Sequence, residues 1–208
     1  MWKYNWIWAV LTGYLAGSLL FARIFGRLIG KKEITEDSRD KNPGTANAFL
    51  YGGFWCGCLT LCGDLLKGFL PVFFFFHFCS PAIFEHYFPG AFVLAAPVAG
   101  HIFPVFSHFR GGKGIAATFG CLLGLFPHLV PAAVLACLFL FFSLILRITP
   151  HFYRTAAVYL LSAVLITAGT ELKPVEAGFL IITGMVCWRL HVSEEEREKC
   201  KVSLLWKF

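Results

Sequence analysis

Residues 100–118 read GHIFPVFSHFRGGKGIAAT and lie between two strongly apolar segments of the chain. This stretch nevertheless carries two histidines, one arginine, one lysine and four glycines. The whole chain of 208 residues is 58% hydrophobic and contains 24 phenylalanines, which is typical of an integral membrane protein. The place of a polar, glycine-rich island in such a chain is the main question that the sequence raises.

The apolar runs on both sides of this island predict an all-α, polytopic integral membrane protein that forms one domain over residues 1–208. Glycines, prolines and charged clusters divide the chain into seven apolar segments, some of them shorter than the ~20 residues that a bilayer crossing needs. We therefore expect about seven transmembrane helices, with five or six as alternatives. The expected segments are 4–28, 48–78, 88–109, 115–126, 130–146, 155–169 and 177–190.

The basic residues predict the orientation of these segments, because Lys and Arg accumulate in cytoplasmic loops. With the N-terminus outside, 15 of the 18 Lys and Arg residues fall on the cytoplasmic side, two fall outside, and Lys67 lies within a span. We expect this orientation, with the polar motifs facing the cytoplasm. The first segment lacks a strongly basic start, so we expect it to remain as a transmembrane helix rather than a cleaved signal peptide.

Composition also argues against several functional classes. The formal charge is +6, but the basic residues come in small groups between apolar runs, which indicates topology determinants rather than a nucleic-acid surface. The eight cysteines form no metal-binding array, so we expect no metal and no cofactor. No obligatory protein partner is evident in the sequence.

The RGGKG sequence at residues 110–114 has chemistry suited to a phosphate. Gly111, Gly112 and Gly114 let backbone N–H groups approach one anion, while Arg110 and Lys113 supply positive charge. A helix that begins near Gly114 adds further N–H groups. The sequence is not a Walker loop, because Lys113 is followed by glycine. A cytoplasmic turn with ordinary topology-determining charges is the alternative that spacing alone leaves open.

Three polar residues inside apolar segments have two interpretations each. Asp64 and Lys67 lie one helical turn apart, where an isolated charge costs ~3 kcal/mol, so we expect them to pair. That pair either docks one helix on another or places the ammonium beside the phosphate site. His101 lies in a segment with two prolines, so it either bonds a carbonyl freed by a proline or acts as a donor or general base.

Four motifs in this order resemble the acyl-phosphate-dependent glycerol-3-phosphate acyltransferases of bacterial membranes, the PlsY family. The resemblance covers most of residues 13–126 and is most specific in the last motif. The motifs are GSLLFARIFGRLIG (17–30), KNPGTANAF (41–49), GDLLKGFLPV (63–72) and GHIFPVFSHFRGGKGIAATFG (100–120).

This resemblance implies a multi-pass enzyme of the bacterial inner membrane that acts in phospholipid biosynthesis. Its reaction would transfer a fatty acyl group from acyl phosphate to the 1-hydroxyl of sn-glycerol 3-phosphate, giving lysophosphatidate and phosphate. The expected catalytic residues are His101 and Lys113. The expected substrate-binding residues are Ser18, Asn42, Gly44, Asn47, Lys67, Arg110, Gly111, Gly112 and Gly114.

The chain departs from the family pattern at several phosphate-binding positions. A serine of the pattern is Asp40 here, an arginine is Leu50, a second serine is Pro150, and a threonine is Ala117. Arg39 and Arg147 are candidates to compensate for the lost groups, and Arg189 and His191 are counterparts of a C-terminal motif.

Two further functions remain open, the first of them because of these departures. A non-catalytic relative would bind a lipid phosphate or a membrane partner without turnover. A transporter or channel is the third possibility, although Asp64 and Lys67 are the only clear charged pair within a span and no inverted repeat is visible.

Overall fold

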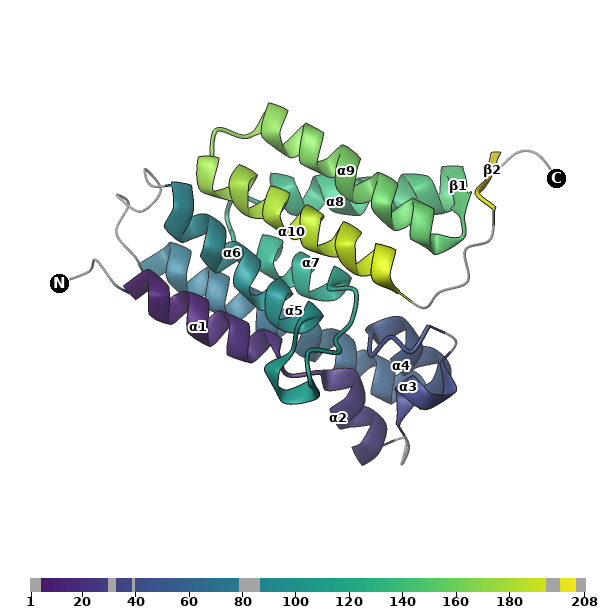
Figure 1. The fold of residues 1–208 in the computed structure, drawn as a ribbon. Helices are drawn as coiled ribbons and strands as arrows, with labels where there is room; N and C mark the ends of the chain where they lie inside the picture. The colour runs from purple at the N-terminus through teal and green to yellow at the C-terminus, as the bar shows by residue number, and fades with distance from the viewer. Residues whose placement is uncertain (1–4, 30–32, 39, 79–86, 194–198, 205–208) are drawn as a thin grey trace.

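The computed structural model describes residues 5–29, 33–38, 40–78, 87–193 and 199–204, which form a helical bundle (Figure 1). The helices are α1 (Asn5–Gly17), α2 (Phe21–Leu28), α3 (Ile34–Asp37), α4 (Thr45–Gly52), α5 (Phe54–Phe78), α6 (Tyr87–Ile102), α7 (Ile115–Leu123), α8 (Val130–Leu140), α9 (His151–Gly169) and α10 (Lys173–Val192). A 3-10 turn (Val105–Ser107), a π-helical turn (Phe141–Ile145) and two strands, β1 (Leu146–Thr149) and β2 (Lys201–Leu204), complete the described part.

Each of the seven predicted segments contains helix, but the segments differ in their capacity to cross a bilayer. Within the described residues, five helical stretches are long and apolar enough to cross. They are Trp6–Leu28, Phe54–Phe78, Phe88–Ser107, His151–Gly169 and Lys173–Val192. Helix α7 has only nine residues, and Val130–Ile145 is a shorter apolar helix. The structure therefore supports the lower of the expected numbers of crossings.

Two predicted spans are each divided into two helices. Helix α1 ends at Gly17 and α2 begins at Phe21, although the sequence predicts one helix there. Likewise α4 ends at Gly52 and α5 starts at Phe54, because Gly53 between them has a left-handed φ of 85° that glycine adopts readily. The interruptions free backbone groups, and those groups must find partners inside the protein.

The helices pack closely where small residues meet. Helix α5 contacts α7, and α6 lies between α1 and α10. A Cβ atom on Gly68 of α5 would collide with the Ala117 carbonyl of α7, and a Cβ atom on Gly120 would collide with the Leu65 carbonyl of α5. Only glycine permits this approach, which brings the start of α7 against the middle of α5.

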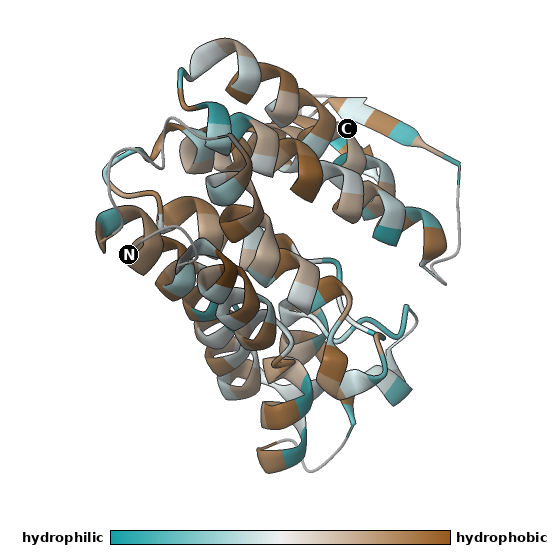
Figure 2. Ribbon diagram, turned by 60° about the vertical axis from the view of Figure 1, so that its left-hand side comes forward, coloured by the Kyte–Doolittle hydropathy of each residue, from teal (hydrophilic) through white to brown (hydrophobic). Residues whose placement is uncertain are grey.

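A continuous apolar core is built from residues of α5, α6, α7, α8, α9 and α10. Figure 1 shows how these helices are arranged. Leu94, Tyr159 and Phe179 are fully buried in this core, and the rings of Tyr159 and Phe179 stack with centroids 5.9 Å apart. On the outer surface, large apolar side chains such as Trp8 and Trp55 are exposed, as a lipid environment allows. Brown and pale residues dominate the helices in Figure 2, and teal residues gather mainly near helix ends and in loops.

Strand β1 pairs with β2 in an antiparallel ladder that sequence analysis did not predict. Arg147 lies opposite Ser203 in this ladder. The pairing attaches the C-terminal segment to the chain immediately before α9.

Candidate functional site

The glycine-rich loop 110–114 is held against the end of α6. The Gly112 N–H donates to the His101 carbonyl at 3.1 Å, and Arg189 Nη2 donates to the Gly111 carbonyl at 2.9 Å. Gly114 has a left-handed φ of 80° and caps α7, which starts at the next residue. One expectation therefore changes: the Gly112 N–H bonds a carbonyl and is not available to an anion.

Lys113 extends from this loop into a cluster of polar side chains. Its Nζ atom lies 2.9 Å from Asp40 Oδ2 and 2.8 Å from His151 Nε2. An ammonium group only donates, so His151 Nε2 is the acceptor and carries no proton. Lys113 is buried, with 5% of its surface exposed, which makes these partners necessary.

Asp40 has a second set of partners. Its Oδ1 atom accepts from Asn47 Nδ2 at 2.8 Å and from the Asn42 N–H at 3.3 Å. Burial raises the pKa of Asp40, but the charge of Lys113 and these hydrogen bonds outweigh burial, so its pKa lies below the ordinary value. Asp40 is therefore ionised at neutral pH and forms a true ion pair with Lys113.

A second buried charge cluster lies deeper, on α5 and α6. Lys67 Nζ is 2.7 Å from Asp64 Oδ1, which confirms the predicted pairing, and it also donates to the Leu19 carbonyl at 2.6 Å. The same ammonium is 2.8 Å from His101 Nδ1. His101 Nδ1 is thus an acceptor, and its neutral ring carries the proton on Nε2.

A cavity of about 630 Å³, here called the amphiphilic cavity, is lined by members of both clusters and by apolar side chains. Its charged and amide-bearing lining residues, together here called its polar end, are Asp40, Asn42, Asn47, Asp64, His101, Lys113, His151 and Arg154. Its apolar part is lined by Leu50, Leu61, Leu65, Ile115, Ala116, Phe119, Leu123 and Phe139. The cavity thus has the polarity of a molecule with a charged head and a fatty tail.

Three helices present their N-terminal ends to this cavity. Residues from the first turns of α4, α7 and α9 line it. The free N–H groups and positive dipole end of each helix favour an anion. Three such ends around one cavity, with Lys113 and Arg154, make its polar end an anion-binding environment.

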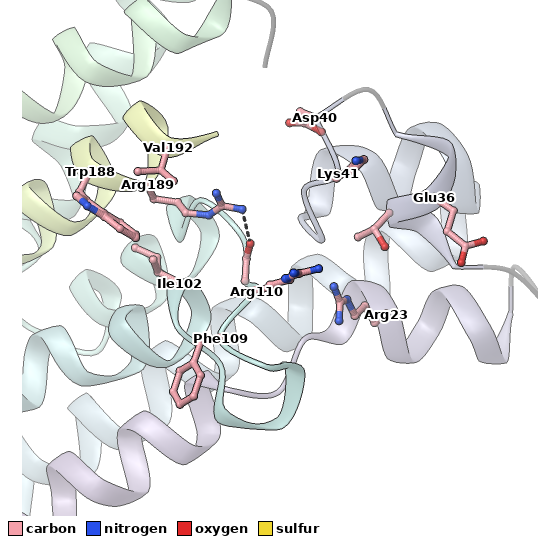
Figure 3. A pocket seen from close by; sticks show the side chains of 12 residues that line it. Arg23, Glu36, Asp40, Lys41, Ile102, Phe109, Arg110, Trp188, Arg189 and Val192 are labelled. Atoms are coloured by element: carbon pink, nitrogen blue, oxygen red, sulfur yellow. Dashed lines mark hydrogen bonds between the residues drawn. The ribbon is translucent and has the colours of Figure 1, made fainter. Parts of the chain in front are cut away.

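A second cavity of about 520 Å³, here called the basic cavity, shares the lining residue Asp40 with the first. Figure 3 shows basic side chains from separate elements around it: Arg23 from α2, Arg110 from the glycine-rich loop and Arg189 from α10. Lys41 adds a fourth basic group, against the acidic Glu36 and Asp40. The surplus of positive charge suits a small polyanion.

The structure distributes the sequence-predicted residues between the walls of these cavities and the layer behind them. The amphiphilic cavity is lined by Asn42, Gly44, Asn47, His101, Lys113 and Gly114, and the basic cavity by Arg110 and Gly111. Ser18, Lys67 and Gly112 line neither. Ser18 is buried and its Oγ donates to the Tyr14 carbonyl at 2.9 Å.

The candidates for compensation also have defined places. Arg147 is exposed on β1 and lines neither cavity, and Arg39 is outside the described residues. Arg189 lines the basic cavity. His151 and Arg154, which sequence analysis did not select, line the amphiphilic cavity. Their spacing of three residues at the start of an apolar helix was the available signal, since it puts both on one face.

Within the described residues, no group of three or more His, Cys, Asp or Glu side chains has the arrangement of a metal site. The charged side chains at the two cavities are instead arranged around space for anions.

The protein-family description "Glycerol-3-phosphate acyltransferase" matches residues 7–197. A glycerol-3-phosphate acyltransferase of Azotobacter vinelandii is 36% identical over 205 residues, covering 93% of this chain and 98% of the relative. One of Pseudomonas aeruginosa (strain LESB58) is 34% identical over 187 residues, covering 88% and 90%.

The fold has a match among solved structures. The crystal structure of PlsY (YgiH), an integral membrane glycerol 3-phosphate acyltransferase, in its glycerol 3-phosphate form superposes with a TM-score of 0.73. The two chains are 23% identical, and the match covers 90% of this chain and 88% of the other. By its sequence matches over nearly its whole length, this multi-pass membrane protein belongs to the glycerol-3-phosphate acyltransferase family.

Proposed function

We propose that the protein transfers a fatty acyl group from acyl phosphate to the 1-hydroxyl of sn-glycerol 3-phosphate, releasing lysophosphatidate and inorganic phosphate. Family membership supports the acceptor and the class of reaction. The amphiphilic cavity is the single observation that supports the donor, because an acyl phosphate has a charged head joined directly to a fatty chain.

The chemistry of the amphiphilic cavity favours one orientation of the bound donor. Its phosphate lies at the polar end, with Lys113 and the N-termini of α4, α7 and α9. Its acyl chain lies along Leu61, Phe119 and Phe139. Burying each methylene of that chain contributes about 0.8 kcal/mol, so the apolar wall supplies affinity while the polar end fixes the position of the reacting carbonyl.

The acceptor fits the basic cavity. Glycerol 3-phosphate is a small polyanion, and Arg23, Arg110 and Arg189 surround the space available to its phosphate. Because Asp40 lines both cavities, an acceptor there has its free hydroxyl near the polar end of the donor cavity. The positive charges on both sides offset the repulsion between the two phosphates.

The chemistry needs no covalent enzyme intermediate. The acceptor oxygen forms a bond to the acyl carbon, the bond from that carbon to the phosphate oxygen breaks, and phosphate leaves with the electron pair. The hydroxyl proton passes to a phosphate oxygen. His101 acts as a donor in this scheme, because its Nδ1 accepts from Lys67 and its proton is on Nε2. Catalysis then comes from positioning and charge neutralisation.

The remaining predicted residues support this arrangement. Asn42, Gly44 and Asn47 form the wall next to the donor phosphate, with Gly44 at the cap of α4. Lys67 and Ser18 act from behind the wall: Lys67 orients His101, and Ser18 stabilises the end of α1. Gly112 permits the close packing of the loop on His101, since a Cβ atom there would collide with Nε2.

The proposed location is the bacterial inner membrane, with the N-terminus outside and both cavities open to the cytoplasmic side. The distribution of Lys and Arg supports this orientation. Lipid-soluble donor and water-soluble acceptor would then arrive from the inner leaflet and the cytoplasm. No protein partner is required in this proposal.

The test is acyl transfer by the purified protein in lipid, supplied with a long-chain acyl phosphate and labelled glycerol 3-phosphate. Lys113→Ala should lower kcat/KM about a hundredfold or more, because it removes a buried charge at the donor phosphate. Lys201→Ala is the matched control, because Lys201 is exposed on β2 and lines neither cavity. Absence of lysophosphatidate with folded wild-type protein refutes the proposal.

One observation favours a second candidate function. The Asp40 carboxylate already neutralises Lys113, so a phosphate must compete with a built-in anion. If the folded protein binds a phosphate-bearing lipid and makes no product, a non-catalytic lipid-binding role replaces the enzymatic one.

A further inference from the structure

The first turn of α9 brings two basic side chains to the polar end of the amphiphilic cavity. His151 and Arg154 are three residues apart, lie on one face of the helix, and both line the cavity together with Thr155. Helix α9 has 19 residues, so its N-terminal end carries the positive partial charge of a long helix. These residues are therefore placed beside the anion-binding end of the cavity.

The two basic residues differ in their partners. His151 accepts from Lys113 at 2.8 Å, which fixes the position of that ammonium. Arg154 Nε is buried and meets no hydrogen-bond partner among the described residues. A buried guanidinium nitrogen without a partner costs free energy unless a ligand supplies an acceptor. Arg154 is thus prepared for an anion that enters the cavity.

A second polar group in the same cavity lacks a partner. Asn42 is nine-tenths buried, with 9% of its surface exposed, and its Oδ1 meets no hydrogen-bond partner among the described residues. A side-chain amide presents either its oxygen or its NH₂ by rotating about one bond, so it pairs with a phosphate hydroxyl or a phosphate oxygen. Unpaired groups on two elements of one cavity, Arg154 on α9 and Asn42 before α4, indicate a bound ligand with several polar atoms.

The lining of the cavity indicates whether the bound phosphate belongs to the acyl donor or to the acceptor. Arg154 lines the cavity whose apolar lining includes Phe119 and Phe139, and it does not line the basic cavity. We propose that Arg154 binds the phosphate of the acyl donor and that His151 positions Lys113 against the same phosphate. This assignment rests on the proposed acyl transfer. It makes α9 the source of a phosphate-binding arginine in this chain, in which position 50, an arginine in the family pattern, is leucine.

The experiment compares steady-state kinetics with the donor and the acceptor varied separately. Arg154→Gln should raise the KM for a long-chain acyl phosphate at least about tenfold, because it removes a charged hydrogen bond, and should change the KM for glycerol 3-phosphate less than about twofold. Arg154→Lys keeps the charge and should recover part of the loss. Lys201→Gln is the matched control, because it removes one positive charge from an exposed site outside both cavities.

A second measurement separates failure of this proposal from failure of the proposed reaction. Inorganic phosphate should raise the thermal unfolding temperature of the wild-type protein and of Lys201→Gln, and should raise that of Arg154→Gln much less. This measurement needs no turnover. If the wild-type protein proves inactive, the proposed reaction is refuted, but the phosphate-binding measurement still tests the Arg154 subsite. The subsite proposal is overturned if Arg154→Gln and Lys201→Gln respond alike to phosphate, or if Arg154→Gln affects only the acceptor KM.

Discussion

Replacing Asp40 by asparagine should strengthen phosphate binding while weakening the fold. Asp40 Oδ2 lies 2.9 Å from Lys113 Nζ, a separation at which opposite unit charges attract by about 6 kcal/mol at an effective dielectric constant of 20. Desolvation offsets most of this attraction, so loss of the pair should lower the free energy of unfolding by about 1–2 kcal/mol. For a protein of this size, that corresponds to a fall of roughly 2–8 °C in Tm.

The same substitution should favour phosphate binding, although it destabilises the fold. A phosphate about 4 Å from the Asp40 carboxylate is repelled by about 4 kcal/mol at the same dielectric constant, before solvent and counter-ions reduce the repulsion. If about a third of that value persists, Asp40→Asn should bind inorganic phosphate about tenfold more tightly. Lys113 then meets the ligand without a competing carboxylate.

The assay is inhibition of acyl transfer by inorganic phosphate at pH 7, with the donor varied. The pKa of Asp40 lies below its ordinary value, so its contribution to stability is present above the unfolded pKa of about 3.9 and is lost as pH falls through the folded pKa. The ion pair is therefore complete at pH 7, where the comparison is made. Asp40→Glu keeps the charge and serves as the control. A phosphate Ki in Asp40→Asn that equals or exceeds the wild-type value refutes the reasoning.

Two further substitutions test the support of the site. Gly114→Ala forces a side chain into a φ of 80° and puts its Cβ atom 3.0 Å from Val98 Cγ1. We therefore expect the unfolding free energy to fall by about 1–2 kcal/mol and the activity to fall as well, as measured by thermal unfolding and acyl transfer. A variant as stable as the wild-type protein would contradict this. Asp64→Asn leaves the Lys67 ammonium buried without its carboxylate and should cost about 3–5 kcal/mol, whereas the double variant Asp64→Asn/Lys67→Met should recover part of that loss in the same unfolding measurement.

The features that sequence predicted best depend on local pattern. Apolar length gave the helical segments, and the cost of a lone charge in lipid gave the pairing of Asp64 with Lys67. The lysine of the glycine-rich loop, Lys113, shares a cavity with Asn42 and His101. Each of these predictions follows from residues within one or two helical turns, or from motifs whose order matches a known family.

The features that sequence missed depend on how distant elements meet. Nothing local shows that the Gly112 N–H bonds the end of α6, because the acceptor is eleven residues away in another element. Arg147 and Arg154 look equivalent as basic residues near the start of one helix. Tertiary packing gives them different environments: Arg147 is exposed on β1, which pairs with β2, whereas Arg154 lines the cavity.

The interruption between α1 and α2 links two positions 48 residues apart. The Leu19 carbonyl lies in that interruption and accepts from Lys67 Nζ at 2.6 Å. The buried Lys67 ammonium needs an acceptor, and the Leu19 carbonyl of the unwound turn needs a donor, so each stabilises the other. Within the membrane, either group alone would lack a hydrogen-bond partner. Homologous chains should therefore covary at these two places: a relative that loses the lysine should carry one uninterrupted first helix.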